Sequence, residues 1–194
     1  MRKAVFLDRD GTINVEKGYL YRIKDFEYIN GVVEALHLLQ KMGYTLVIIT
    51  NQSGIARGYY AEETFLSLTR WMVSDLQQKG IPVAGVYYCP HHPDGGVKKY
   101  AVACECRKPG TKLFWQAQED LQVDMEHSYA IGDKMRDIAI CWESGVQGIV
   151  LDEEESVSFC CNTKYSEKKP IWKCHNLYEA AKKIYETECN KKVL

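Results

Sequence analysis

The chain has 194 residues and a formal net charge of -1, because 26 Asp and Glu slightly outnumber 25 Lys and Arg. This balance gives no field that would attract nucleic acid or a membrane, and no run of about 18 apolar residues indicates a membrane helix. The first apolar run ends at Asp8. It is too short for a signal peptide, so we expect a cytoplasmic protein. The length predicts one domain over residues 1–194.

Short apolar runs alternate along the chain with segments of helical period. Strands are predicted over 3–7, 44–50, 83–89, 128–133, 146–151 and 171–174, and helices over 31–44, 61–80, 111–122, 134–145 and 176–188. The first helix should have Asn30 as its N-cap and should end at Gly43. This alternation predicts an α/β fold with a doubly wound, Rossmann-like parallel sheet.

Two segments interrupt the alternation. Residues 89–110 are rich in Pro, Gly, His and Cys and predict an irregular insert. Residues 152–170 are polar and have no period, so we expect a long surface loop, with the acidic run from Asp152 to Glu155 in solvent. The chain has eight cysteines, and a reducing cytoplasm favours burial, metal binding or catalysis for them over disulfides.

Chemically active side chains gather where the predicted strands end. In a parallel sheet these carboxyl ends share one edge, where ligands bind. The ends supply Asp8 and Asp10, then Thr50, Asn51, Gln52 and Ser53, then Arg107 and Lys108, and last Asp133, Lys134 and Asp137. This mixture, without a Ser-His or Cys-His pair, indicates a phosphate and a hard divalent cation. Asp8 and Asp10 should face one spot, because residues i and i+2 of an extended chain share a side.

Four short motifs carry a family resemblance. They are "DRDGT" at 8–12, "TNQSG" at 50–54, "RKPG" at 107–110 and "GDKMRD" at 132–137. In this order they resemble the motifs of the haloacid dehalogenase superfamily of phosphatases. The insert "CPHHPDGGVKKYAVACECRKPG" is similar to the zinc loop of D-glycero-D-manno-heptose 1,7-bisphosphate phosphatases. Histidinol-phosphate phosphatases have a similar loop, but the stretch between its first two cysteines is typically shorter.

The resemblance implies a role for each motif. Asp8 is the expected nucleophile, which attacks phosphorus to give an aspartyl phosphate. Asp10 is expected to protonate the leaving sugar oxygen and later to take a proton from water. Thr50 and Lys108 are expected to hold the phosphoryl oxygens. We expect Mg²⁺ on Asp8, on Asp133 and on the backbone carbonyl of Asp10.

Further residues are expected to contact the substrate, again by resemblance. They are Glu16, Lys17, Gly18, Tyr19, Asn51, Gln52, Ser53, Arg107 and Lys134. Arg107 suits a distal phosphate or sugar hydroxyls, because guanidinium binds phosphate through a two-pronged fork. Asp137 has two open interpretations, which are support for the metal ligands and an acidic group at the start of a helix.

The insert also predicts a zinc site. Its ligand set would be Cys89, His91, Cys104 and Cys106, because each close pair places two ligands on one side of an extended chain. His92 is a competing ligand, and the family pattern favours His91. Such a zinc has no open position, so we expect a structural role that holds the following "RKPG" motif in place.

Together these features predict a Mg²⁺-dependent phosphatase with a structural Zn²⁺. The spacing between the first two motifs leaves no room for a cap domain, so the fold should be capless and the site open, with the insert as its roof. The expected substrate is a small sugar phosphate, best heptose 1,7-bisphosphate cleaved at C7 to heptose 1-phosphate. We expect a monomer with no nucleic-acid or membrane partner.

Two alternatives stay open. Within the same class, the substrate is histidinol phosphate or another small monoester. From another class, a phospho-receiver signalling domain also combines carboxylates, Thr and Lys on a doubly wound sheet. Receivers carry their phosphorylated Asp after a middle strand, where this chain has Thr50 and Asn51.

Overall fold

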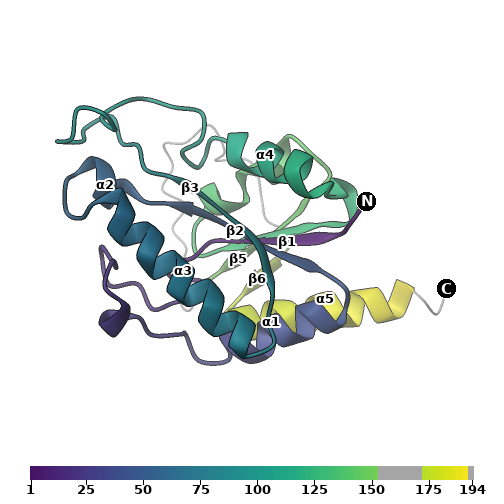
Figure 1. Ribbon diagram of the computed structural model, residues 1–194. Coiled ribbons are helices and arrows are strands. Elements are labelled where there is room, and N and C mark those ends of the chain that lie inside the picture. Colours follow the sequence, from purple (N-terminus) through teal and green to yellow (C-terminus); the bar gives the residue numbers. More distant parts are fainter. Residues whose placement is uncertain (153–171, 192–194) are drawn as a thin grey trace.

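A single parallel sheet forms the centre of the described structure. The computed structural model describes residues 1–152 and 172–191. Six strands pair in the order β3-β2-β1-β4-β5-β6 (Figure 1). They are β1 (Ala4–Leu7), β2 (Thr45–Asn51), β3 (Val83–Cys89), β4 (Tyr129–Gly132), β5 (Gln147–Leu151) and β6 (Trp172–Cys174). The chain builds outward from β1 to β3, then returns to β4 beside β1 and builds toward β6. The order therefore reverses between β1 and β4, where open α/β sheets bind ligands.

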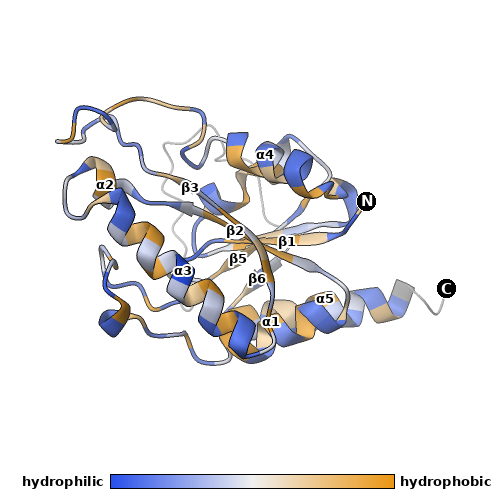
Figure 2. Ribbon diagram, viewed as in Figure 1, coloured by the Kyte–Doolittle hydropathy of each residue, from blue (hydrophilic) through white to orange (hydrophobic). Residues whose placement is uncertain are grey.

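Helices cover both faces of the sheet (Figure 1). On one face lie α1 (Val32–Lys41), α3 (Glu62–Gln78) and α5 (Leu177–Lys191), and on the other lie α4 (Lys112–Leu121) and the 3-10 helix η3 (Met135–Trp142). Alternation along β1 supplies both layers, because Val5 and Leu7 pack into the first and Ala4 and Phe6 into the second. Figure 2 shows the apolar residues concentrated in the strands and striped along the helices.

The predicted α/β fold with a doubly wound parallel sheet is confirmed, and each predicted strand is present. One predicted detail is confirmed in a different form and one is wrong. The helix expected over 134–145 is present as the 3-10 helix η3. The N-cap of α1 is Gly31 rather than Asn30, because the chain enters the helix with φ 81° at Gly31, a left-handed conformation that suits glycine.

Three short elements escape prediction because they are too short to show a period. They are α2 (Ser53–Ala56), η1 (Ile23–Asp25) and η2 (Met125–His127). From residue 153 onward, the expected surface loop and its acidic run lie outside the described residues. The single domain over residues 1–194 therefore stays a prediction. Within residues 1–152 and 172–191, no helix combines the length and the apolar character needed to cross a membrane.

Candidate active site

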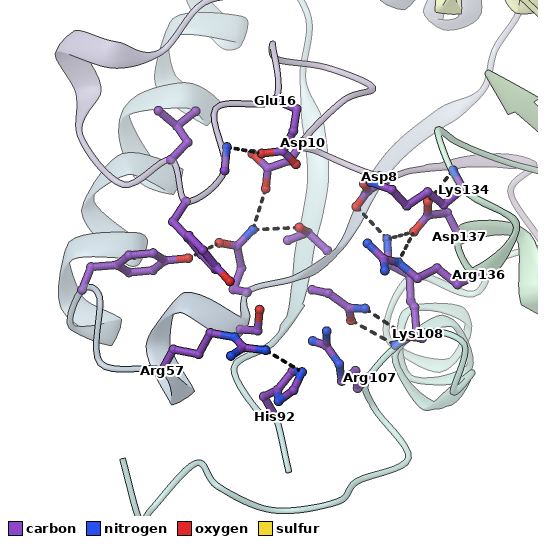
Figure 3. Close-up of a pocket in the computed structure, with 18 residues that line it drawn as sticks. Asp8, Asp10, Glu16, Arg57, His92, Arg107, Lys108, Lys134, Arg136 and Asp137 are labelled. Atoms are coloured by element: carbon purple, nitrogen blue, oxygen red, sulfur yellow. Dashed lines mark hydrogen bonds and ion pairs between the residues drawn. The ribbon is translucent and has the colours of Figure 1, made fainter. Parts of the chain in front are cut away.

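Loops that follow the strands gather at one end of the sheet, around a cavity of about 260 Å³. Most of the predicted site residues line it. These are Asp8, Asp10, Glu16, Gly18, Tyr19, Thr50, Asn51, Gln52, Ser53, Arg107, Lys108 and Lys134. Figure 3 shows the carboxylates Asp8 and Asp137 close to Lys108, with Arg57 and His92 on another side of the cavity. The topology thus brings together motifs that are far apart in the sequence.

Lys108 joins two carboxylates at the bottom of the cavity. Its Nζ lies 2.6 Å from Asp8 Oδ1 and 2.8 Å from Asp137 Oδ1, and it donates to the carbonyl oxygen of Ile49 at 2.6 Å. Burial opposes the charge on this side chain, but Asp137 and Asp8 outweigh burial and raise the pKa of Lys108 above its ordinary value. The ammonium group therefore stays charged and can face an anionic phosphoryl group.

Asp8 follows β1 directly and is buried. Burial raises the pKa of Asp8 to about 7 against the opposing charge of Lys108, and the Asp137 carboxylate adds to the rise. Asp8, Asp133 and Asp137, which we call the acidic cluster, each place a carboxylate oxygen within 4.8 Å of the others. Ionised carboxylates this close together repel one another. A bound cation would relieve this repulsion and favour the ionised form of Asp8.

The acidic cluster offers the ligands that Mg²⁺ prefers. Asp133 follows β4, and its Oδ1 is buried with no hydrogen-bond partner among the described residues. Its Oδ2 accepts from Lys134 Nζ at 2.8 Å. Gly11 makes room for this carboxylate, because a Cβ at position 11 would lie 2.7 Å from Asp133 Oδ2. Carboxylate oxygens with an unused acceptor therefore fit a hard divalent cation here.

Asp137 contacts both the start of a helix and the buried Lys108. At the start of η3, its Oδ2 accepts the backbone N–H of Lys134 at 3.0 Å. Its other oxygen is paired with Lys108 in the acidic cluster. The residue therefore caps a helix and also anchors the buried lysine.

Asp10 lines the same cavity as Asp8, but its carboxylate has different partners. It accepts from Arg9 Nη2 at 2.8 Å, from Asn14 Nδ2 at 3.0 Å and from Gln52 Nε2 at 3.0 Å. The chain turns sharply here, because the Arg9 carbonyl accepts three backbone N–H groups of the following residues. The two carboxylates therefore point to different groups (Figure 3), unlike those of an extended chain.

The motif after β2 supports the site from inside the protein. Thr50 is buried, and its hydroxyl oxygen accepts from Gln52 Nε2 at 2.9 Å. The Asn51 amide clamps the backbone of Lys108, because it donates to the Lys108 carbonyl and accepts the Lys108 N–H, both at 3.0 Å. Ser53 lines the cavity at the start of α2. Asn51 and Gln52, expected as substrate contacts, therefore use hydrogen bonds to hold other site residues.

One side of the cavity is rich in positive charge. Arg57 and Arg107 line it together with His92, whereas Lys134 and Arg136 lie beside Asp8 and Asp137 (Figure 3). Burial lowers the pKa of Arg107, and the nearby Arg136 and Arg57 add to this effect. Arg57 Nη2 lies 3.1 Å from His92 Nε2, and Arg57 Nε is buried without a partner in the described part of the chain. This positive side is suited to a second anionic group.

The loop after β1 contributes part of its predicted set. Glu16, Gly18 and Tyr19 line the cavity. Burial raises the pKa of Glu16, and the nearby Asp10 carboxylate adds to the rise. Lys17 instead pairs with Glu27 at 2.9 Å on the protein surface. The structure therefore brings all of this loop segment except Lys17 to the cavity.

The insert forms a second compact group. Cys89, His91, Cys104 and Cys106, which we call the cysteine cluster, each place a ligand atom within 4.8 Å of the others. Pairs of sulfur atoms lie 3.2 to 3.5 Å apart, and His91 Nδ1 lies 3.4 Å from Cys106 Sγ. Ligands around a tetrahedral zinc have separations of about this size. His92 contacts Arg57 and is not in the cluster.

The sequence analysis does not single out several residues in or beside the cavity. Arg9 lies inside the "DRDGT" motif, and a charged residue between two aspartates was a usable signal. Arg57 follows the "TNQSG" motif by two residues and could have been noticed for the same reason. Arg136 lies inside the "GDKMRD" motif and carries the same kind of signal. Tyr60 gives no sequence signal, because its role depends on packing that only the fold provides.

Comparisons with known proteins agree with this geometry. The model of the family described as polynucleotide kinase 3 phosphatase matches residues 3–171. A protein of Yersinia pestis named D-glycero-beta-D-manno-heptose-1,7-bisphosphate 7-phosphatase is 53% identical over 135 residues, which cover 70% of this chain and 72% of the relative. The protein of the same name from Haemophilus ducreyi is 50% identical over 151 residues, 77% of this chain and 82% of the relative.

Two solved structures are also similar. A putative HAD-like phosphatase from Mesorhizobium loti superposes with a TM-score of 0.73 at 32% identity, covering 80% of this chain and 75% of that one. The D,D-heptose 1,7-bisphosphate phosphatase of B. bronchiseptica, complexed with magnesium and phosphate, has a TM-score of 0.75 at 26% identity. That match covers 95% of this chain and 99% of the other.

Proposed function

Because the chain belongs to the polynucleotide kinase 3 phosphatase family of HAD-like phosphatases, we propose that it hydrolyses a small sugar bisphosphate with Mg²⁺ as cofactor. The substrate best supported is D-glycero-β-D-manno-heptose 1,7-bisphosphate, cleaved at C7 to heptose 1-phosphate. The family model is named for polynucleotides, whereas the relatives at 50% identity or more are named for the heptose bisphosphate. We follow these relatives because their identity to the chain is high.

One observation carries the proposal. At the ligand-binding edge of the sheet, Asp8 lies 2.6 Å from the ammonium group of Lys108, with Asp133 and Asp137 beside it. A nucleophilic carboxylate and a cation that attracts phosphate therefore line one cavity, and the spare carboxylate oxygen of Asp133 lies within 4.8 Å of the Asp8 carboxylate. Phosphoryl transfer needs this combination, because its catalysis relies mainly on positioning and charge stabilisation.

The reaction divides into two steps. Asp8 attacks phosphorus, a bond forms from its carboxylate oxygen to phosphorus, and the bond from phosphorus to the sugar oxygen breaks. Asp10 gives its proton to the departing sugar oxygen. In the second step Asp10 takes a proton from a water molecule, whose oxygen attacks phosphorus and releases inorganic phosphate and free Asp8. Lys108 and the Thr50 hydroxyl hold the phosphoryl oxygens in both steps.

The acidic cluster would hold Mg²⁺ through Asp8 and Asp133, together with the backbone carbonyl of Asp10. The unpartnered Asp133 Oδ1 supports this assignment. The bound ion supplies positive charge that lets two anionic groups approach each other. Asp137 contributes by holding Lys108, and Lys134 keeps the second oxygen of Asp133 in place.

The cysteine cluster would hold a structural Zn²⁺, which its three sulfurs and one imidazole fit. Cys106 is followed directly by Arg107 and Lys108. The Arg107 side chain also donates from Nη1 to the carbonyl oxygen of His91 at 3.4 Å. The cluster would therefore fix the start of the segment that delivers Lys108 to the acidic cluster.

The positive side of the cavity supports a substrate with two phosphates. One phosphoryl group would lie beside Lys108, and Arg57 and Arg107 remain for the other. Guanidinium groups bind phosphate through paired hydrogen bonds, which also fixes its orientation. Histidinol phosphate has only one phosphate, so this charge distribution favours the bisphosphate. The expected monomer and its cytoplasmic location stay predictions.

A panel of phosphorylated substrates tests the proposal. The panel compares kcat/KM with Mg²⁺ for heptose 1,7-bisphosphate, for histidinol phosphate and for simple sugar monophosphates. We expect the highest value for the heptose bisphosphate, with release of inorganic phosphate over many turnovers. A highest value on histidinol phosphate would reject the proposed substrate. A single slowly decaying acyl phosphate without turnover would favour a receiver domain.

A further inference from the structure

We propose that Tyr60 is a positioning residue that sets Asp10 and Thr50 for the reaction through the side chain of Gln52. This inference rests on the proposed phosphatase function. Tyr60 is 8% exposed and lines the cavity. Its hydroxyl donates a hydrogen bond to Gln52 Oε1 at 2.7 Å. This contact matters because the other end of the Gln52 amide is hydrogen-bonded to both Asp10 and Thr50.

Gln52 links two groups that act on the same phosphate. Its Nε2 donates to Asp10 Oδ2 at 3.0 Å and to Thr50 Oγ1 at 2.9 Å. Turning the amide over would place its oxygen against the Asp10 carboxylate and its NH₂ group against Arg9, whose Nη2 lies 3.5 Å from Oε1. Both contacts would be repulsive. The donors Tyr60 and Arg9 therefore determine which end of the amide faces the reacting groups.

The orientation of Gln52 also directs the hydroxyl proton of Thr50. Because Thr50 Oγ1 accepts the Gln52 N–H, its own proton must turn to another acceptor. Thr50 lines the cavity, where a phosphoryl oxygen is the acceptor that the proposed reaction supplies. The same NH₂ group holds Asp10 Oδ2, so the proton donor and the phosphate-binding hydroxyl keep a fixed relation to each other.

Packing keeps the Tyr60 ring in place. The ring stacks on Tyr21, with centroids 5.3 Å apart and planes inclined by 20°, and it packs in a cluster with Ile55 and Phe65. Gly54 makes this arrangement possible, because a Cβ at that position would overlap the ring. Burial raises the pKa of Tyr60, so its hydroxyl keeps the proton that it donates.

The leaving group distinguishes positioning of Asp10 from a general structural role. A sugar oxygen leaves poorly without a proton, whereas p-nitrophenolate leaves without one. We therefore measure Tyr60→Phe on heptose 1,7-bisphosphate and on p-nitrophenyl phosphate. Because Asp10 protonates the leaving group only in the first step, the rate of aspartyl-phosphate formation is measured in a single turnover. We expect this rate to fall about tenfold on the sugar substrate and by no more than about threefold on the aryl substrate, with KM little changed.

Tyr21→Phe is the matched control. It removes a hydroxyl from the ring stacked on Tyr60 and leaves the bond from Tyr60 to Gln52 in place. We expect wild-type kcat on both substrates. Equal losses on both substrates for Tyr60→Phe, or no loss on either, would overturn the inference. A wild-type enzyme inactive on both substrates would overturn the proposed function and this inference with it.

A double-mutant cycle tests whether Tyr60 acts through Gln52. Gln52→Leu removes both amide contacts, so we expect a larger loss of kcat than in Tyr60→Phe. Adding Tyr60→Phe to Gln52→Leu should then change kcat by less than about twofold. If the loss of kcat in the double variant equals the product of the two single losses, Tyr60 acts independently of Gln52. That result would overturn the inference. Circular dichroism of each variant confirms that the compared proteins are folded.

Discussion

The chain assembles the acidic cluster and the cysteine cluster in opposite ways. Asp8 and Asp133 lie far apart in the sequence and meet because β1 pairs with β4. The cysteine cluster comes from one segment, residues 89–106. The first therefore requires the pairing of β1 with β4, whereas the second requires only the end of β3 and the insert that follows it.

Lys108 is where the two regions meet. It follows the cysteine cluster by two residues, and its ammonium group lies between Asp8 and Asp137. Because hard oxygen ligands and soft sulfur ligands select different metals, each region can be disrupted separately. Damage to the acidic cluster should abolish chemistry and leave zinc in place. Damage to the cysteine cluster should weaken chemistry through Lys108.

The largest effect is expected from Asp8→Asn, which removes the nucleophile. We expect kcat to fall by at least about 10⁴-fold, because no covalent intermediate can form. The zinc content, measured by metal analysis on the same sample, should equal that of the wild type. Activity near the wild-type level would refute the role of Asp8, and loss of zinc would refute the independence of the two regions.

Asp10→Ala should have the next largest effect. We expect kcat on the sugar bisphosphate to fall by roughly 10²–10⁴-fold, since neither the leaving oxygen nor the attacking water exchanges a proton with this position. The matched control is Asp25→Ala, which removes a carboxylate paired with Arg22 on the surface. Steady-state kinetics of both variants give the result. Unchanged turnover in Asp10→Ala would exclude the proton-transfer role.

Cys104→Ser tests how far damage to the cysteine cluster spreads. We expect loss of most bound zinc and a fall in kcat/KM of about 10–100-fold, because Lys108 is no longer held firmly. Cys189→Ser is the matched control, since Cys189 is exposed in α5. Metal analysis and kinetics are made on the same preparations. Full activity without zinc would mean that the insert does not support Lys108.

Arg57→Gln should sharpen the difference between substrates. We expect kcat/KM to fall about tenfold or somewhat more for the heptose bisphosphate, because one charged contact to its second phosphate is lost. A sugar monophosphate should lose less than about threefold. Equal losses on the two substrates would place Arg57 at the reacting phosphate and would argue against a separate site for the second one.

The smallest expected effect is a dependence of the Mg²⁺ affinity on pH. Burial raises the pKa of Asp8 to about 7, so below this pH the metal-free protein carries a proton that the ion must displace. Mg²⁺ affinity should therefore fall by up to about tenfold for each pH unit below 7 and should level off above it. Titration calorimetry at pH 6 and pH 8 measures this. Equal affinities at both values would contradict the raised pKa.

The same pKa predicts the direction of a stability change. Between about pH 4 and 7, Asp8 is protonated in the folded metal-free protein and ionised in the unfolded chain. The contribution of this group to the free energy of unfolding should therefore decrease as the pH rises through that range. Added Mg²⁺ should oppose the decrease, and thermal unfolding with and without Mg²⁺ reveals the difference.

Much of the fold was predictable because each strand contains a short apolar run and the longer helices carry a clear hydrophobic period. The predicted and observed bounds of β3, Val83–Cys89, agree, because its apolar run marks the strand. The 3-10 form of η3 was not predictable, because its residues have a helical pattern and the tight turn is set by Asp137 at the acidic cluster. The N-cap at Gly31 was not predictable either, because it depends on how the chain passes from the preceding loop into α1.

The candidate site was predictable where a motif marks it and not where packing decides. Asp8, Thr50 and Lys108 lie at strand ends or follow the insert, so topology alone brings them together. The hydrogen bond from the Gln52 amide to Asp10 and the hydrogen bond from Tyr60 to Gln52 depend on side-chain orientation. Hydropathy patterns contain no information about which way an amide faces.

Rapid quenching shows whether Asp8 becomes bonded to phosphorus during turnover. Enzyme with Mg²⁺ is mixed with excess heptose 1,7-bisphosphate, quenched in acid within the first turnover, and digested for mass spectrometry. We expect one phosphoryl group on the peptide that contains Asp8, attached at that residue. Turnover with the phosphoryl group on another residue, or with no phosphorylated peptide at any quench time, would contradict it.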